Sequence, residues 1–204
     1  MSGTFPSTQG LRGLNFTNNQ PNLIAIAASG RRQAKSQGAQ FFSFTVQTPP
    51  MSTTEHKDLM GFLAAQRGQF STFEIVLPNI SKPAGSVTGN PLRVATDIAA
   101  GLKSIAVTSG LTNKTDYLKR GDVVRFGTDP KVYMLTADVD TDGSGNATLS
   151  IEPGLITAID GSPSAVAVET NDVKFTVFMG SPITEYNTGV ADYTTLEFEA
   201  REAF

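Results

Sequence analysis

The 204-residue sequence has no cysteine, no tryptophan and a single histidine, His56. Without cysteine the chain can form neither disulfides nor thiolate metal sites, and a cysteine nucleophile is excluded. A Ser/His/Asp triad would have to use His56, and no G-x-S-x-G motif accompanies it. The sequence therefore predicts no enzyme, no cofactor and no metal site. A glycosidase that uses two carboxylates is the weakest alternative, which spacing alone does not exclude because the 19 Asp and Glu residues are scattered.

Charged residues are also scarce, at 17 % of the chain against about 25 % in average soluble domains. The formal net charge is -3, so the basic balance that phosphate-driven binding requires is missing, and we expect no sequence-specific nucleic acid partner. No apolar run is long enough to span a bilayer, and the start lacks a basic-then-apolar signal segment. We therefore expect that the protein does not insert into a membrane and that it is synthesised in a cytosol. We also expect that neighbouring subunits cover much of its surface.

What the chain does contain is alternating and apolar runs typical of strands. In the first eighty residues these predict strands over 23–27, 41–48 and 69–77, the last of which ends at Pro78. Residues 29–40 have no apolar side chain larger than Ala, and this predicts the exposed tip of a long hairpin.

The predicted tip carries Arg31, Arg32 and Lys35. No aromatic residue lies between them, so base stacking is unsupported. A solvated tip is one interpretation. The other is an arm that reaches a neighbouring acidic subunit, where charge complementarity fixes register and partner choice. These three residues are the candidate subunit-interface residues.

One long helix is predicted over residues 52–68. Ser52 and Glu55 have the spacing of a capping box, and Gly68 suits a left-handed helix end. His56 is expected on the solvated side of this helix. The apolar face is expected to carry Leu59, Met60, Phe62 and Leu63.

From residue 81 the sequence becomes poor in bulky residues and contains two prolines, which is typical of a domain junction. Beyond it lie short predicted strands at 92–95, 104–108, 122–126, 132–136, 147–151 and 165–168. Such a series indicates a small barrel, which would leave no free strand edges.

Residues 172–204 return to longer alternating runs. Val173, Phe175 and Val177 form one set, and Leu196, Phe198 and Ala200 another, with Glu197, Glu199 and Arg201 on the other face. These strands need a partner sheet. The simplest arrangement pairs them with the strands before Pro78, so that the barrel is an insertion into a domain built from both chain ends.

The segment Asp138–Asn146 resembles the first half of a calcium-binding loop, with Asp at alternate positions and Gly at the sixth. The second half fails, because Leu149 stands where a bidentate carboxylate is required. A hydrated hairpin turn is the favoured interpretation, and calcium binding stays open.

Several stretches resemble the distal tail protein of long-tailed bacteriophages, the siphophages. In the middle of the chain they are residues 119–126, 130–135 and 142–153, which follow the order strand, Asp/Gly turn, strand ending in Pro. Residues 74–78 are similar to the strand end before the family's insertion, and residues 193–204 to its closing strand. The resemblance runs from about Phe41 onward.

This resemblance implies a mainly β, α+β fold with one helix. It implies a ring-forming β-sandwich or split-barrel domain over 1–83 and 171–204, and an inserted barrel like an oligosaccharide/oligonucleotide-binding fold (OB-fold) over 84–170. The family forms a hexameric ring in the virion that joins the tail tube protein to the tail-tip or baseplate hub. Assembly in the host cytoplasm, a channel for DNA and no catalytic residues are also implied.

Two other functions stay open at this stage. The inserted barrel could belong to a carbohydrate-binding or adhesin module of the tail tip, or the chain could be another ring protein similar to the tail tube. An aromatic platform for sugars or bases is thin, because Phe126 and Tyr133 are expected in the barrel core.

Overall fold

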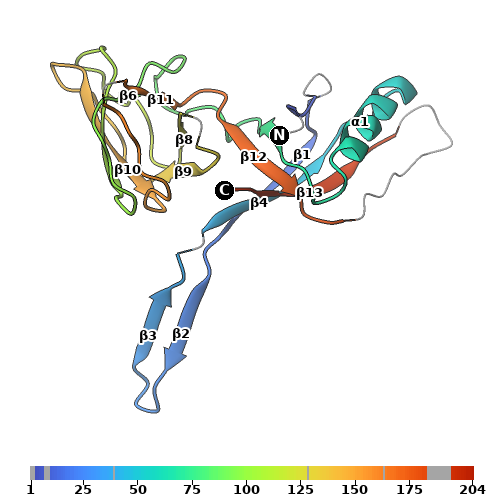
Figure 1. Cartoon of the computed structure of the whole chain (residues 1–204), viewed down its shortest axis with the longest axis horizontal. Helices are drawn as coiled ribbons and strands as arrows, with labels where there is room; N and C mark the ends of the chain where they lie inside the picture. The colour runs from blue at the N-terminus through green and yellow to red at the C-terminus, as the bar shows by residue number, and fades with distance from the viewer. Residues whose placement is uncertain (1–2, 7–9, 39, 128, 163, 183–193) are drawn as a thin grey trace. The chain divides into compact units, whose positions relative to one another are not determined.

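The computed structural model describes residues 3–6, 10–38, 40–127, 129–162, 164–182 and 194–204. In this part of the chain the fold is mainly β with a single helix, as predicted (Figure 1). The chain divides into two compact units: the first comprises Met1–Phe73 and Val177–Glu202, and the second Glu74–Thr176 and Ala203–Phe204.

A five-stranded sheet brings together strands from both ends of the chain. Its order is β1-β4-β13-β12-β5, and β13 pairs antiparallel with both β4 and β12. The pairing of the C-terminal strands with strands before Pro78 is thereby confirmed. The strands are β1 (Gly13–Asn19), β4 (Phe41–Gln47), β5 (Phe73–Val76), β12 (Lys174–Met179) and β13 (Glu197–Glu202).

One face of this sheet is apolar and packed. On β4 the buried positions alternate, Phe42, Phe44 and Val46, and on β13 Phe198 and Ala200 lie opposite Val46 and Phe44. Alternation places every second side chain on the same face, so these residues form one continuous layer. On the other face, over β1, β4 and β13, the outward residues are mainly polar and range from half-buried to exposed.

Helix α1 (Thr53–Ala65) and an N-terminal phenylalanine contribute aromatic rings to this layer. The ring of Phe62 packs edge-on against Phe73 of β5, with 5.5 Å between centroids. Phe5 contacts both Phe62 and Phe198. Such edge-on and tilted ring pairs stabilise a core beyond the apolar area that they bury.

The start of α1 follows the predicted capping box. The Ser52 side chain accepts a hydrogen bond from the Glu55 backbone N–H, and the Glu55 carboxylate accepts one from the Ser52 N–H at 2.9 Å. The helix ends at Ala65, after which Arg67 and Gly68 adopt left-handed conformations. This left-handed Arg67 was not predicted.

The expected solvated position of His56 is wrong. His56 is buried together with Leu59 and Leu63, because spacings of three and four residues place all three on one side of the helix. Met60 and Phe62, expected on the apolar face, are only half-buried.

Replacing Ser52 with Ala removes the oxygen that accepts from the Glu55 N–H. We expect Ser52→Ala to lower the free energy of unfolding by about 1 kcal/mol, the usual cost of losing an N-cap. Urea denaturation followed by circular dichroism measures this change, and Ser52→Asp, which supplies another cap acceptor, should restore most of it. No loss in Ser52→Ala would contradict the role of the cap.

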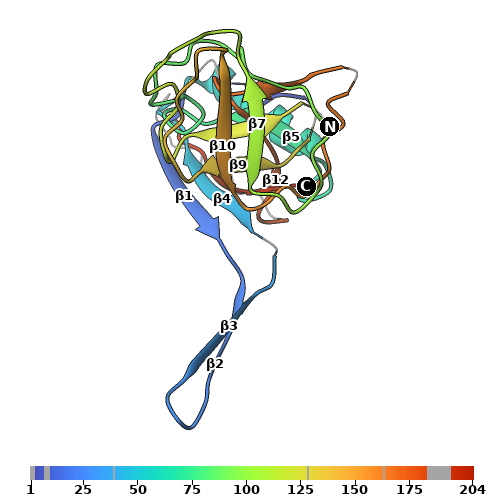
Figure 2. The same cartoon turned by 90° about the vertical axis from the view of Figure 1, so that its left-hand side faces the viewer.

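The second unit contains a closed six-stranded barrel, as the short strands predicted. Around it the order is β10-β7-β6-β11-β8-β9, and each predicted strand range overlaps the observed one. Figure 2 shows β7, β9 and β10 labelled on this unit. The bounds are β6 (Arg93–Val94), β7 (Ser104–Thr108), β8 (Val123–Phe126), β9 (Val132–Leu135), β10 (Asn146–Glu152) and β11 (Val166–Glu169).

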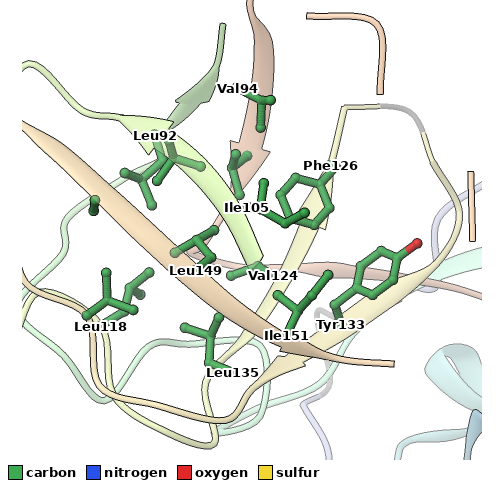
Figure 3. Packing of buried hydrophobic residues seen from close by; sticks show 14 of the residues in the cluster. Leu92, Val94, Ile105, Leu118, Val124, Phe126, Tyr133, Leu135, Leu149 and Ile151 are labelled. Atoms are coloured by element: carbon green, nitrogen blue, oxygen red, sulfur yellow. The ribbon is translucent and has the colours of Figure 1, made fainter. Parts of the chain in front are cut away.

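Branched aliphatic side chains and three aromatic rings, those of Tyr117, Phe126 and Tyr133, fill the barrel (Figure 3). Ile105, Val124 and Leu149 are fully buried, and they come from three different strands. Phe126 and Tyr133 are buried with 5.5 Å between ring centroids, so their expected place in the core is confirmed. The barrel interior is packed with side chains, and a ligand would have to bind on its outer surface.

Candidate functional site

A two-stranded hairpin extends the β1–β4 ladder beyond the five-stranded sheet (Figures 1 and 2). It consists of β2 (Asn22–Ile26) and β3 (Arg32–Ser36). At its base the Gln37 N–H donates to the Pro21 carbonyl at 3.1 Å, which continues the hydrogen bonding from the sheet. We call residues 20–37 the arm.

The turn at the end of the arm is shorter than predicted. The Ala27 N–H donates to the Arg31 carbonyl at 3.0 Å, and the Gly30 N–H donates to the Ala27 carbonyl. Residues 29–40 therefore do not all form the tip, because Arg32–Ser36 pairs with Asn22–Ile26. This strand has no apolar alternation, so its sequence gave no strand signal.

Apolar side chains of the arm lie in solvent. Ile26 is 72 % exposed, and Leu23 and Ile24 are each more than half exposed. Every residue of both arm strands is exposed. An isolated two-stranded hairpin is marginally stable in water, and its free edges can pair with another chain. An arm with these properties is suited to binding another surface.

The three predicted interface residues all lie on the arm. Arg31 lies in the turn, Arg32 opens β3 opposite Ile26, and Lys35 is opposite Leu23. Because neighbouring positions of a strand point to opposite faces, Arg32 and Lys35 place positive charge on both faces of the arm. No acidic residue precedes Glu55 in the sequence, so the arm carries no compensating negative charge.

The exposed face of the sheet over β1, β4 and β13 contains two carboxylates, and we call it the open face. Glu197 and Glu199 are exposed there, at alternate positions of β13. The Gln47 side chain donates to the Glu197 carboxylate at 2.8 Å, and the Arg201 guanidinium stacks 3.7 Å above the Phe41 ring. A hollow of about 360 Å³ lies on this face, lined in part by Asn15, Thr17, Ser43, Thr45, Glu199 and Arg201.

The aspartates of the segment that resembles half of a calcium loop accept hydrogen bonds from backbone N–H groups. Asp142 accepts from the N–H groups of Asn146 and Ser144, each at 2.8 Å, and these bonds lower the pKa of its carboxyl. The Asp140 carboxylate accepts from the Asp116 N–H. These contacts agree with the hairpin-turn interpretation, in which Asp side chains stabilise local backbone.

An outer groove of the barrel, about 660 Å³ in volume, lies beside this loop. It lies over β7 and β10, and the side chains that line it are small or acidic. Polar lining residues are Thr96, Thr108, Asp140, Thr141, Asp142, Asn146 and Thr148.

A buried ion network that the sequence did not reveal lies in the second unit. Arg125 of β8 is only 7 % exposed and contacts Glu169 of β11 at 2.8 Å and Glu74 of β5 at 3.2 Å. Lys174 of β12 also contacts Glu74, at 3.3 Å. The sequence indicated this network only through Arg125, a charged residue inside the otherwise apolar run VVRF. A buried charge requires an oppositely charged partner, and the local sequence does not identify that partner.

The network makes stability depend on pH. Burial disfavours the charged form of Glu74, but the hydrogen bond and ion pairs with Arg125 and Lys174 outweigh it, and the pKa is lowered from 4.5. A carboxyl with a lowered folded-state pKa stabilises the fold above its unfolded pKa, and this contribution is lost as the pH falls below about 4.5.

We expect Glu74→Gln to be less stable than the parent at pH 7 and to lose less stability between pH 5 and 3, as measured by urea denaturation across that range. An unchanged pH slope would contradict this role of Glu74.

No helix in the described segments has the length and apolar character needed to cross a membrane. No model of a known protein family matches the chain, and no curated protein matches its sequence with significance.

Proposed function

We propose that the protein is a structural virion protein that forms a hexameric ring at the distal end of a phage tail. The ring joins the tail tube to the tail-tip or baseplate hub and leaves a channel for DNA. In this proposal residues 1–83 and 171–204 form the ring domain as a sandwich or split barrel, and residues 84–170 form an inserted OB-fold-like barrel.

The observation that carries the proposal is the exposed arm with its apolar and basic side chains. Apolar residues such as Ile26 gain about 25 cal/mol for each Å² that they remove from water, so an association that covers the arm is favourable. A ring requires an interface in which each copy offers one surface to one neighbour and a different surface to the other. The arm provides one such surface, and the sheet from which it extends provides others.

Electron microscopy of the purified full chain tests the ring. Class averages should show closed six-fold particles, and native mass spectrometry should give a mass close to six times 21.6 kDa. The proposal is contradicted if only monomers are observed at protein concentrations at which other ring-forming proteins assemble.

The outer groove of the barrel favours a second candidate, a carbohydrate-binding module of the tail tip. Asp140, Asp142 and Asn146 offer acceptors and donors for sugar hydroxyls next to the small side chains of Ala106 and Ala147. A glycan array with the full chain tests it. Binding that Asn146→Ala abolishes would favour this function, and the absence of any bound glycan would leave the barrel as a spacer.

A further inference from the structure

We propose that the arm of one copy lies along the open face of β4 and β13 in the next copy, so that Arg31 in the turn and Arg32, on the arm face that also carries Ile24 and Ile26, meet Glu197 and Glu199. This inference rests on the proposed ring, and it identifies the surface that receives the arm. The occupant is a second copy of this chain.

Charge complementarity supports this pairing. The arm carries three positive charges and no negative one, and the open face presents two exposed carboxylates at adjacent outward positions of one strand. The other acidic groups in the described part of the first unit are less suitable, and of these Asp58 is exposed but lies on α1 next to Lys57. Glu55 is held in the capping box, and Glu202 is buried, where its carboxylate accepts from the Phe42 N–H at 3.1 Å.

The arm extends away from its own sheet, which is why a second copy is required. β2 and β3 continue outward from β1 and β4 and do not fold back over the sheet (Figures 1 and 2). An arm that binds the face of the next copy leaves its own face free for the arm of the previous copy. This arrangement is head-to-tail, and it forms a ring when the rotation closes.

The dimensions of the two surfaces agree. The five residues of β2 reach about 17 Å, and the seven residues of β4 span about 23 Å, so the paired part of the arm fits within the length of β4. The hollow on the open face lies along β4 and β13, beside Glu199 and Arg201. Arg201 is also exposed on this face, but its guanidinium is held 3.7 Å above the Phe41 ring, and the two carboxylates of Glu197 and Glu199 leave the three charged side chains with a net negative charge.

A charge-swap experiment tests the pairing. The arm variant carries Arg31→Glu and Arg32→Glu, and the face variant carries Glu197→Lys and Glu199→Lys; Lys35, on the opposite face of the arm, is left unchanged. Each variant alone brings like charges together at every interface, so we expect loss of the higher-order species that the parent forms. Multi-angle light scattering after size exclusion measures the mass, and circular dichroism verifies that each variant is folded.

Mixing the two variants should restore assembly. The reversed arm then meets the reversed face, and the parent arm of the face variant meets the parent face of the arm variant. Both kinds of interface pair opposite charges, so the copies must alternate and only even-numbered rings can close. Native mass spectrometry of the mixture should show equal numbers of the two variants in each ring.

A matched control reverses two acids away from the open face. Asp58→Lys with Asp160→Lys makes the same change in net charge at exposed positions of the helix and the barrel, and assembly should persist. If the parent assembles and the folded face variant assembles equally well, the open face is not the receptor, although the ring itself stands. If the parent does not assemble, the proposed function fails first.

Discussion

Replacing Leu149 with Ala is expected to lower the free energy of unfolding by about 3 to 4 kcal/mol. Leu149 lies at the centre of β10 and is fully buried among the side chains of neighbouring barrel strands (Figure 3). Truncation removes its transfer free energy and leaves a cavity, and buried Leu to Ala changes cost about 2 to 5 kcal/mol. Hydrogen-bonded strands on both sides limit collapse of the barrel around the cavity, which places the effect above the lower end of this range.

Guanidinium denaturation measures this effect through tyrosine fluorescence, because Tyr117 and Tyr133 are both in the barrel core and the chain has no tryptophan. Thr148→Ala is the matched control. Thr148 is the preceding residue of β10 and is exposed, so its replacement should change the free energy by no more than about 0.5 kcal/mol. Equal small effects for both variants would show that the barrel interior is not packed as described.

Strands with one buried face could be predicted from the sequence, because burial of one face makes apolar residues recur at every second position. The alternation of Phe42, Phe44 and Val46 has a direct counterpart in their burial, and the same holds for Phe198 and Ala200. The barrel strands are short, yet turn residues separate them, and this fixed their approximate bounds. Alternation also predicted that Glu197 and Glu199 lie on the face opposite the core.

Strands held mainly by backbone pairing could not be predicted in the same way. β1 reads GLNFTNN and β3 reads RQAKS, and neither buries a regular apolar set. Their conformation depends on hydrogen bonding to β4 and β2, which pattern analysis does not detect. The buried position of His56 was missed for a different reason: a helix contacts its sheet along a stripe, and the position of that stripe depends on tertiary packing.

The arm and the open face belong to the same compact unit but have different physical origins. The open face is polar because every second residue of β4 and β13 is required for the core on the other side. The arm combines apolar and charged side chains on the same face, because Ile24 and Ile26 lie on the face that also carries Arg32. Surfaces that combine apolar contact with steering charges associate quickly and in one orientation.

Replacing Arg125 with Met is expected to lower the free energy of unfolding by about 3 kcal/mol. The guanidinium bridges Glu169 and Glu74, whose side chains are only 24 % and 17 % exposed. Removing one partner of a buried ion pair leaves an uncompensated buried charge, and this costs about 3 to 5 kcal/mol. Lys174 continues to pair with Glu74, so the lower end of that range is expected.

The triple variant Arg125→Met, Glu169→Gln and Glu74→Gln separates the cost of uncompensated charge from the value of the network itself. With both carboxylates neutral, stability should recover by at least half of the loss, because amides cost less to bury than unpaired carboxylates. Lys103→Met is the exposed counterpart, since Lys103 and Glu152 form a pair at 2.6 Å that is largely in solvent, and it should cost less than about 1 kcal/mol. An equal loss in Arg125→Met and Lys103→Met would mean that the Arg125 network is as well solvated as the surface pair, and the assignment of a buried charge to β8 would be wrong.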